Sequence, residues 1–352
     1  MSSGYYLLPS ISGDTVVFVS EDDLWSIPAQ GGIARRLTSS LSLATRPCLS
    51  PDGKYLAFVG RDEGNWEIYL MPSLGGQAQR LTFMGGNQCQ TVGWTADGKI
   101  IFASNAAQPF DDLFYLYTVD IEGNQPQRLN VGPARAISYG PDGACVIGRN
   151  TGDLARWKRY RGGTAGQIWI DRNGDGNFQP LIQLKGNLTS PMWLRERIYF
   201  LSDHEGIGNL YSCLTSGEDL RRHTEHSSYY ARNATTDGRR IVYHAGADLY
   251  LYDPTQGKSE MISVEFYSPQ VQRNRKFVDA ARYLEDAALH PKGASLAITS
   301  RGKLYTFSNW EGAVLQHGEP QGVRYRLPEW LNDGKRLICL TDMGGEEHFI
   351  II

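Results

Sequence analysis

Three arginines occupy a similar place in three separate strand-like segments: Thr45-Arg46-Pro47, Ala134-Arg135-Ala136 and Ala231-Arg232-Asn233. A guanidinium group presents a planar fork of N–H donors that matches the two oxygens of a carboxylate. If these segments surround one channel, Arg46, Arg135 and Arg232 would attract the carboxylates of peptides into it. The alternative is that each arginine pairs with a carboxylate of a neighbouring segment or reaches solvent.

Other chemically capable residues are not arranged for hydrolysis or for metal binding. The sequence has no G-x-S-x-G elbow, no H-E-x-x-H zinc motif and no phosphate-binding P-loop. His223 and His226 are three residues apart at the end of a predicted strand, where that spacing places them on opposite faces. We therefore predict no catalytic residue, no metal and no cofactor within this chain.

The segment Asp171–Asn177 resembles the first half of a calcium-binding loop, because alternate oxygen side chains and glycines surround such an ion. The position of the loop's bidentate glutamate is Ile182, so the strongest ligand is missing. A long hairpin loop rich in Asn, Gly and Asp explains the same residues. We favour the hairpin and leave calcium binding open.

A second unusual segment, Arg156–Gly163, interleaves cations with aromatic residues, as nucleic-acid-binding loops do. The chain as a whole, however, has 35 Lys and Arg against 38 Asp and Glu, a net charge of -3. The broad positive field that nucleic-acid binding needs is absent. We therefore expect this segment to dock another domain or subunit.

Composition also bears on whether the chain is a membrane, secreted or cytoplasmic protein. No apolar run approaches the roughly 18 residues of a membrane helix. The N-terminus lacks the basic start and apolar core of a secretory signal. The five cysteines are scattered without a C-x-x-C pair, which argues against disulfides and zinc. These features predict a cytoplasmic protein with reduced thiols.

The elements that must position the arginines come from an internal repeat. One unit runs from Ser50-Pro51-Asp52-Gly53 through the apolar runs Leu56–Phe58 and Ile68–Leu70 to Arg80-Leu81-Thr82. Asp-Gly is typical of tight hairpin turns, and the apolar runs are typical of buried strands. The unit therefore predicts a four-stranded antiparallel meander. The turn between its first two strands recurs eight times, at Gly13-Asp14, Asp52-Gly53, Asp97-Gly98, Asp142-Gly143, Arg195-Glu196, Asp237-Gly238, Lys292-Gly293 and Asp333-Gly334.

Four-stranded repeats of this period stack around an axis, since one small sheet cannot bury both faces alone. We predict an all-β chain, with a six-bladed β-propeller over residues 1–283. Residues 284–352 would begin a second, probably seven-bladed propeller and supply its first one to two blades. The basic, irregular stretch Gln270–Lys276 precedes that boundary. A single ring of seven or eight blades is the alternative.

Several segments resemble the N-terminal region of the tricorn protease family. The most specific is Val146–Thr151 with Trp157–Thr164 and Ile168–Ile170, and the others include Ser104–Phe110 and Arg197–Phe200. The resemblance covers nearly the whole chain. It implies a six-bladed propeller, a seven-bladed propeller, and a PDZ-like domain flanked by catalytic domains that carry Ser, His and Glu.

The resemblance also implies a hexameric serine peptidase that degrades oligopeptides downstream of the proteasome and uses its propellers as routes or filters. Residues 1–352 alone are then expected to be inactive and to take part in transit and assembly. One departure concerns Phe83–Cys89. The matching family loop carries paired arginines thought to hold a substrate carboxylate, whereas this loop has no basic residue.

Two alternatives share the fold: a non-catalytic TolB-like scaffold that binds proteins, and the propeller of a prolyl-oligopeptidase-like enzyme. Fold alone does not decide among them. In each case every blade carries its own four strands in order. Ring closure is therefore expected to rely on face packing between the first and sixth blades, without strand exchange.

Overall fold

A computed structural model describes residues 5–39, 42–269, 278–279 and 281–352. The chain divides into two compact units, Met1–Gln270 and Val271–Ile352, each of which is described by itself. The basic stretch Gln270–Lys276 noted in the sequence lies outside the described residues. The predicted all-β class is confirmed, and only two short 3-10 helices occur in the described part, η1 (Pro141–Gly143) and η2 (Ala281–Tyr283).

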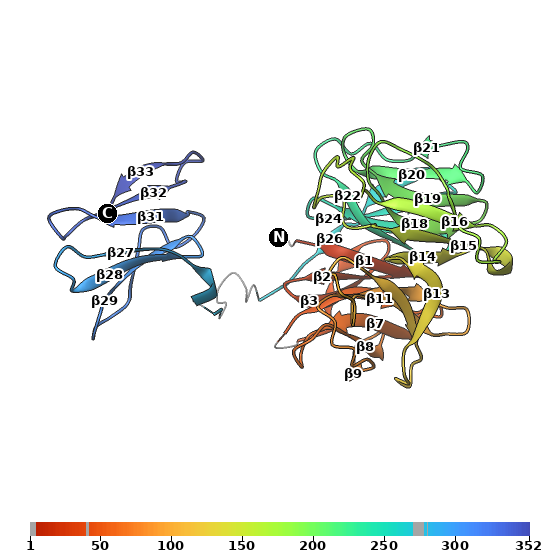
Figure 1. Cartoon of the computed structure of the whole chain (residues 1–352), viewed down its shortest axis with the longest axis horizontal. Coiled ribbons are helices and arrows are strands. Elements are labelled where there is room, and N and C mark those ends of the chain that lie inside the picture. The colour runs from red at the N-terminus through yellow and green to blue at the C-terminus, as the bar shows by residue number, and fades with distance from the viewer. Residues whose placement is uncertain (1–4, 40–41, 270–277, 280) are drawn as a thin grey trace. The chain divides into compact units, whose positions relative to one another are not determined.

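The described residues of unit 1 form six antiparallel sheets of four strands, each taken consecutively from the chain. Figure 1 shows them following one another in colour order. The first three sheets are β1 (Leu7–Ser12), β2 (Thr15–Ser20), β3 (Asp23–Pro28) and β5 (Arg35–Arg36); β6 (Ala44–Leu49), β7 (Tyr55–Gly60), β8 (Glu67–Pro72) and β9 (Gln79–Arg80); and β10 (Cys89–Trp94), β11 (Ile100–Ser104), β12 (Tyr115–Val119) and β13 (Gln127–Pro133).

The other three sheets of unit 1 have the same order. They are β14 (Ala136–Tyr139), β15 (Cys145–Arg149), β16 (Gln167–Asp171) and β17 (Gln179–Pro180); β18 (Leu188–Leu194), β19 (Arg197–Ser202), β20 (Asn209–Leu214) and β21 (Arg221–Arg222); and β22 (Ala231–Thr236), β23 (Ile241–Ala245), β24 (Asp248–Asp253) and β25 (Lys258–Met261). All eight predicted turns join the first two strands of a sheet, as at Gly13, whose φ of 51° suits glycine.

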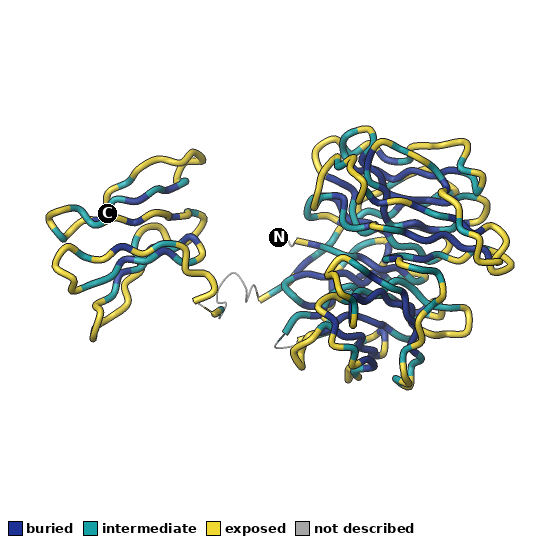
Figure 2. Tube along the Cα trace, viewed as in Figure 1, coloured by how far each residue is buried: buried dark blue, intermediate teal, exposed yellow. Residues whose placement is uncertain are grey.

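The sheets pack face to face around an axis, which makes unit 1 a β-propeller. The first strands lie next to one another in the circular order β1, β6, β10, β14, β18, β22 and back to β1. Apolar clusters fill the spaces between sheets, for example Val59 and Ile68 of the second sheet with Phe102 of the third. Figure 2 shows buried strands within the unit and exposed loops at its edges.

Ring closure differs in one respect from the expectation. No strand is exchanged between the first and sixth sheets, as predicted. Face packing is not the only link, however, because β26 (Val264–Glu265) pairs in parallel with β4 (Gly32–Ile33) of the first repeat. The N–H groups of Gly32 and Ala34 donate to the carbonyls of Ser263 and Glu265, both at 2.9 Å. We call this β4–β26 pair the clasp.

Unit 2 contains two further antiparallel sheets. Both keep the repeat pattern of unit 1. They are β27 (Leu284–Leu289), β28 (Ser295–Ser300), β29 (Lys303–Ser308) and β30 (Leu315–His317); and β31 (Tyr325–Trp330), β32 (Leu337–Thr341) and β33 (His348–Ile351). That these strands begin a second ring at residue 284, after a complete ring at 1–283, stays a prediction. No helix in the described part of the chain is long and apolar enough to cross a membrane.

Candidate functional site

The axis of unit 1 is a cavity of about 910 Å³. Residues of β1, β6, β10, β14, β18 and β22 line it, so the innermost strand of every sheet contributes. Of the three arginines singled out in the sequence, Arg46 and Arg135 line this cavity, whereas Arg232 is not among its lining residues although its neighbour Asn233 is. That the cavity serves as a peptide channel stays a prediction. We call this cavity the central channel.

A repeated irregularity directs side chains into the central channel. Five of the six inner strands described in unit 1 carry a β-bulge, and in four of them one residue of the bulge has a left-handed backbone with φ near 50°. A bulge re-aims a side chain and interrupts the pairing of the strand. The four bulge residues, all of which line the channel, are Leu8, Arg46, Ser190 and Asn233.

Arg46 combines two costly features at one position. Its φ of 49° is unfavourable for a residue with a side chain, and its charged side chain is only partly exposed to solvent. Within the ranges that the structure describes, no hydrogen bond or ion pair to this guanidinium is found. Burial lowers the pKa of Arg46, and attraction to Asp153 opposes the shift. Strained and desolvated charges cluster at functional sites.

Arg135 lines the same channel but has a partner. Its guanidinium lies 3.9 Å from the ring centroid of Phe114 and bonds to the Asp112 carboxylate at 3.1 Å. The Asp112 side chain is largely exposed, so water screens this pair. Burial lowers the pKa of Arg135, and the positive charges of Arg156 and Arg46 add to that effect.

Arg232 is neutralised by a carboxylate from another sheet. Its Nε donates to both oxygens of Asp153, at 2.9 and 3.0 Å, and its Nη2 also donates to one of them. These bonds raise the pKa of Arg232. Burial is the largest single influence and opposes ionisation of Asp153, but the bonds from Arg232 and from the Ala155 N–H, together with the charge of Arg232, lower the pKa of that carboxyl. For Arg232 the alternative foreseen in the sequence, pairing across sheets, is what the structure shows.

The three arginines do not share one register. Arg232 pairs with His244 immediately before the bulge of β22, and the matching residue of β6 is Thr45, which pairs with Val59. Arg46 lies one residue later, at the position of Asn233. A shift of one residue along a strand moves a side chain to the opposite face of the sheet, so Arg46 and Arg232 point in different directions from their strands.

Ser190 and Asn233 are among the polar channel residues that the sequence did not single out as site residues. A usable signal existed for the bulges. Proline follows the left-handed residue at Leu8-Pro9, Arg46-Pro47 and Ser190-Pro191. Proline cannot donate to a ladder, so inside a strand it marks an edge or a bulge.

His223 and His226 are half-buried and make structural hydrogen bonds. His223 bonds to the Ser212 and Tyr252 hydroxyls at 2.7 and 2.8 Å, while His226 bonds to the Tyr243 hydroxyl at 2.9 Å. Both imidazoles thus contact tyrosines of the sixth sheet, and the expectation of opposite faces is wrong. Strand β21 ends at Arg222, so the alternation of a strand does not apply beyond it.

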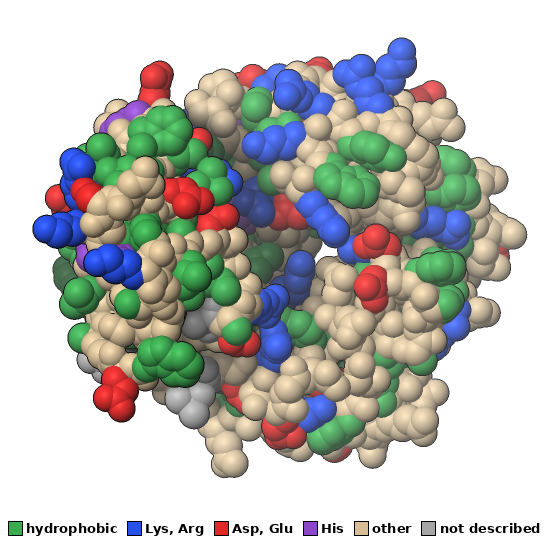
Figure 3. All heavy atoms as spheres, turned by 60° about the vertical axis from the view of Figure 1, so that its left-hand side comes forward, with side chains coloured by type: hydrophobic (Ala, Val, Ile, Leu, Met, Phe, Trp, Pro, Cys, Tyr) green, Lys and Arg blue, Asp and Glu red, His purple; other side chains and the backbone are tan. Residues whose placement is uncertain are grey.

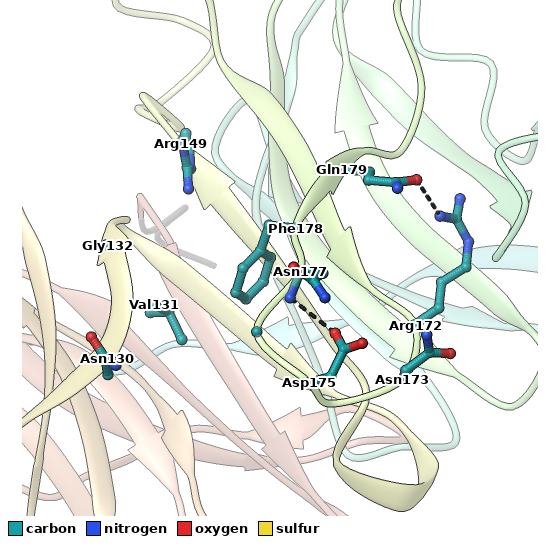
Figure 4. Close-up of a pocket in the computed structure, with 11 residues that line it drawn as sticks. Asn130, Val131, Gly132, Arg149, Arg172, Asn173, Asp175, Asn177, Phe178 and Gln179 are labelled. Atoms are coloured by element: carbon teal, nitrogen blue, oxygen red, sulfur yellow. Dashed lines mark hydrogen bonds between the residues drawn. The ribbon is translucent and has the colours of Figure 1, made fainter.

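The Asp171–Asn177 loop folds around its first carboxylate. Asp171 is buried and accepts the backbone N–H groups of residues 173–176 at 2.7–3.3 Å. The loop borders a polar groove of about 880 Å³ beside β13, where Figure 4 shows Phe178 between Arg149 and Asp175. A carboxylate ringed by N–H donors serves as a turn acceptor.

We expect Asp171→Ala to lower the free energy of unfolding by about 2 kcal/mol, because four backbone N–H groups lose a shared, charged acceptor. Urea denaturation of the chain measures this effect. Asp175→Ala, which removes an acceptor of the neighbouring Asn177 N–H only, is the control and should cost far less. We also expect millimolar calcium to leave the midpoint unchanged. A calcium-dependent rise that disappears in Asp171→Ala would instead identify a calcium site.

The Phe83–Cys89 loop is held by neighbouring side chains. Glu67 accepts the Gly85 N–H at 2.8 Å, and the Arg80 guanidinium lies 4.2 Å from the Phe83 ring centroid. Arg80 itself is paired with Glu63 at 2.6 Å. The basic group nearest this loop in the chain is therefore already neutralised.

The visible surface carries charges of both signs. Figure 3 shows Lys and Arg interspersed with Asp and Glu over this face.

Comparisons with known proteins agree on one family. The family model described as the tricorn protease N-terminal beta propeller domain matches residues 3–258. A tricorn protease homolog of Saccharolobus solfataricus is 37% identical over 97% of this chain and 33% of its own length. The tricorn protease of Thermoplasma acidophilum is 35% identical over 91% of this chain and 30% of its own length.

A crystal structure of the tricorn protease superposes with a TM-score of 0.81 at 30% identity, over 99% of this chain and 35% of that chain. This chain therefore spans about a third of the length of the curated relatives it matches. The match covers most of the sequence, and the shared propeller agrees with it. The chain belongs to the tricorn protease family, as its N-terminal β-propeller region.

Proposed function

We propose that the central channel of unit 1 binds and passes oligopeptides by their carboxylates, as part of a tricorn-type serine peptidase. The observation that carries this proposal is Arg46, a partly buried cation without a bonding partner among the described residues, in a channel about 910 Å³ in volume. An unpaired guanidinium in a partly dry channel binds a carboxylate more strongly than the same group at the surface does.

Cleavage belongs, in this proposal, to the whole peptidase and not to residues 1–352. Family membership supports a hydrolase assignment, and the proposed partners are peptides, PDZ-like and catalytic domains, and further copies in a hexamer. The five cysteines are all free thiols, which fits the proposed cytoplasmic location.

The test of this function is Arg46→Leu. We expect the variant to bind a fluorescein-labelled tetra-alanine with a free C-terminus at least tenfold more weakly, because the cation that pairs with the carboxylate is gone. The same peptide with an amidated C-terminus should bind both proteins equally weakly. Fluorescence anisotropy measures the four affinities. Equal binding of the two peptides to the wild-type chain would contradict the proposal.

Leucine is a suitable replacement because Leu8 occupies the same bulge position with the same left-handed backbone. Arg46→Leu should also raise the free energy of unfolding by about 1 kcal/mol, since a partly buried charge is removed. Arg195→Leu is the matched control. Arg195 has a φ of 55° but lies exposed in the β18–β19 turn, so its loss should change neither affinity nor stability appreciably.

A further inference from the structure

An insertion between β15 and β16 reaches the central channel. It spans residues 150–166, whereas the corresponding link in the sixth sheet, between β23 and β24, is residues 246–247. Thr151, Gly152, Asp153 and Arg156 of this insertion line the channel. Leu154 is buried in the apolar cluster of the fifth and sixth sheets and anchors the segment there.

Beyond that anchor the insertion is held mainly by polar contacts, which include the Lys158 ammonium 5.5 Å from the Tyr230 ring centroid and the Gly166 N–H donating to Asn187 at 3.2 Å. The Arg159 N–H donates to Asp203 at 2.6 Å, and Asn187 donates to the Trp157 carbonyl at 3.1 Å. Trp157 is 56% exposed. A segment with little buried apolar surface opens locally at low free-energy cost. The prediction that Arg156–Gly163 docks another domain or subunit stays a prediction.

Asp153 places a carboxylate where the proposed ligand would bring one. Both oxygens of the Asp153 carboxylate accept hydrogen bonds from Arg232, and the negative charge of Asp153 also attracts Arg46. Its own chain holds it in place, because one oxygen accepts the Ala155 N–H at 3.0 Å. In the described part of the chain, two charged residues of the insertion line the channel. They are Asp153 and the cation Arg156.

We infer that Asp153 is a tethered internal ligand of Arg232 and Arg46, which a peptide carboxylate must displace together with the 150–166 insertion. This inference rests on the proposed function and concerns its regulation. The insertion then sets a threshold for entry, because only a ligand that supplies its own carboxylate compensates for the broken Arg232–Asp153 pair. An amidated or otherwise neutral peptide leaves the insertion in place.

The experiment uses the chain of residues 1–352 and the two tetra-alanine peptides. Asp153→Asn keeps the size of the side chain and one acceptor oxygen but removes the competing charge. We expect it to bind the free-acid peptide at least fivefold more tightly than the wild type does, with no change for the amide. Asp112→Asn, which removes the exposed partner of Arg135, is the control and should change affinity less than twofold.

A second measurement needs no variant. Trypsin cleaves after Arg156, Lys158, Arg159 and Arg161, all within the insertion. The free-acid peptide, and not the amide, should accelerate tryptic cleavage there in the wild type, and Asp153→Asn should be cleaved faster without any peptide.

The outcomes separate the two proposals. If the wild type prefers the free acid while Asp153→Asn shows unchanged affinity and unchanged cleavage, the tethered-ligand inference is overturned and the channel function stands. If neither protein distinguishes the free acid from the amide, both are overturned.

Discussion

Phe266→Ala should lower the free energy of unfolding by about 3 kcal/mol. Phe266 directly follows the clasp strand β26 and is only 4% exposed. Its ring lies 4.5 Å from that of Trp25 and 5.5 Å from that of Tyr6, measured between centroids. Truncation would therefore leave a cavity between the first repeat and the chain that closes the ring. For a unit of this size the loss corresponds to a fall in Tm of roughly 6–12 °C.

Differential scanning calorimetry measures this change, and the adjacent residue provides the control. Tyr267 is 66% exposed, so Tyr267→Ala removes a ring of similar size that contributes little burial and should shift Tm by less than about 2 °C. Phe266→Leu gives an intermediate point if the alanine variant does not fold. Equal Tm values for Phe266→Ala and the wild type would show that the packing of Phe266 against the first repeat does not contribute to closure.

The fold was predictable because its signals are local. Asp-Gly pairs such as Asp52-Gly53 and Asp237-Gly238 set hairpins between the first and second strands, and short apolar runs fill the buried strands. Each sheet is made of consecutive strands, so neighbours in sequence are neighbours in space. A repeat of this kind needs no long-range information to be recognised.

The clasp could not be predicted in the same way. Strands β4 and β26 contain two residues each, too few to show an alternating pattern, and they come from opposite ends of unit 1. Nothing in Gly32-Ile33 or Val264-Glu265 indicates a partner so distant along the chain. Only the closed ring brings the two segments together.

The site was predictable in its location and not in its electrostatics. The inner strands carry arginines, and the repeat places those strands around the axis. Whether a given arginine is paired depends on the 150–166 insertion, whose Asp153 lies 79 residues from Arg232 in the sequence. Arg46 also lies one residue further into its bulge than Arg232 does. In the described ranges Arg46 has no bonding partner, whereas Arg232 is paired. Single-residue shifts of this kind are invisible to hydrophobic patterns, although the proline after Arg46 indicated a bulge.

Acid should destabilise unit 1 because His244 is buried in the neutral form. His244 is fully buried, and its Nε2 accepts a hydrogen bond from the Asn233 amide at 3.0 Å. Burial, with a smaller contribution from the positive charge of Arg232, lowers the pKa of His244 from 6.5 to about 4, while Asp153 opposes the shift. The charged groups facing this imidazole are thus Arg232 and Asp153, one of each sign.

The direction of the effect follows from proton binding. Between pH 6.5 and 4 the unfolded chain binds a proton at His244 that the folded chain does not, so stability is complete above pH 6.5 and falls as the pH decreases. The loss from this residue is at most about 3 kcal/mol, reached near pH 4, below which both states are protonated. His223, whose pKa burial also lowers to about 4, adds to the same decline.

Urea denaturation at a series of pH values from 7 to 4 measures the decline, and His244→Gln should make it shallower while lowering stability at pH 7. Val242→Ala is the matched control on the same strand. Its buried side chain does not titrate, so the cavity should lower the free energy of unfolding by about 1 kcal/mol equally at every pH. If His244→Gln keeps the full pH dependence of the wild type, the acid sensitivity arises elsewhere and the buried neutral imidazole is not its source.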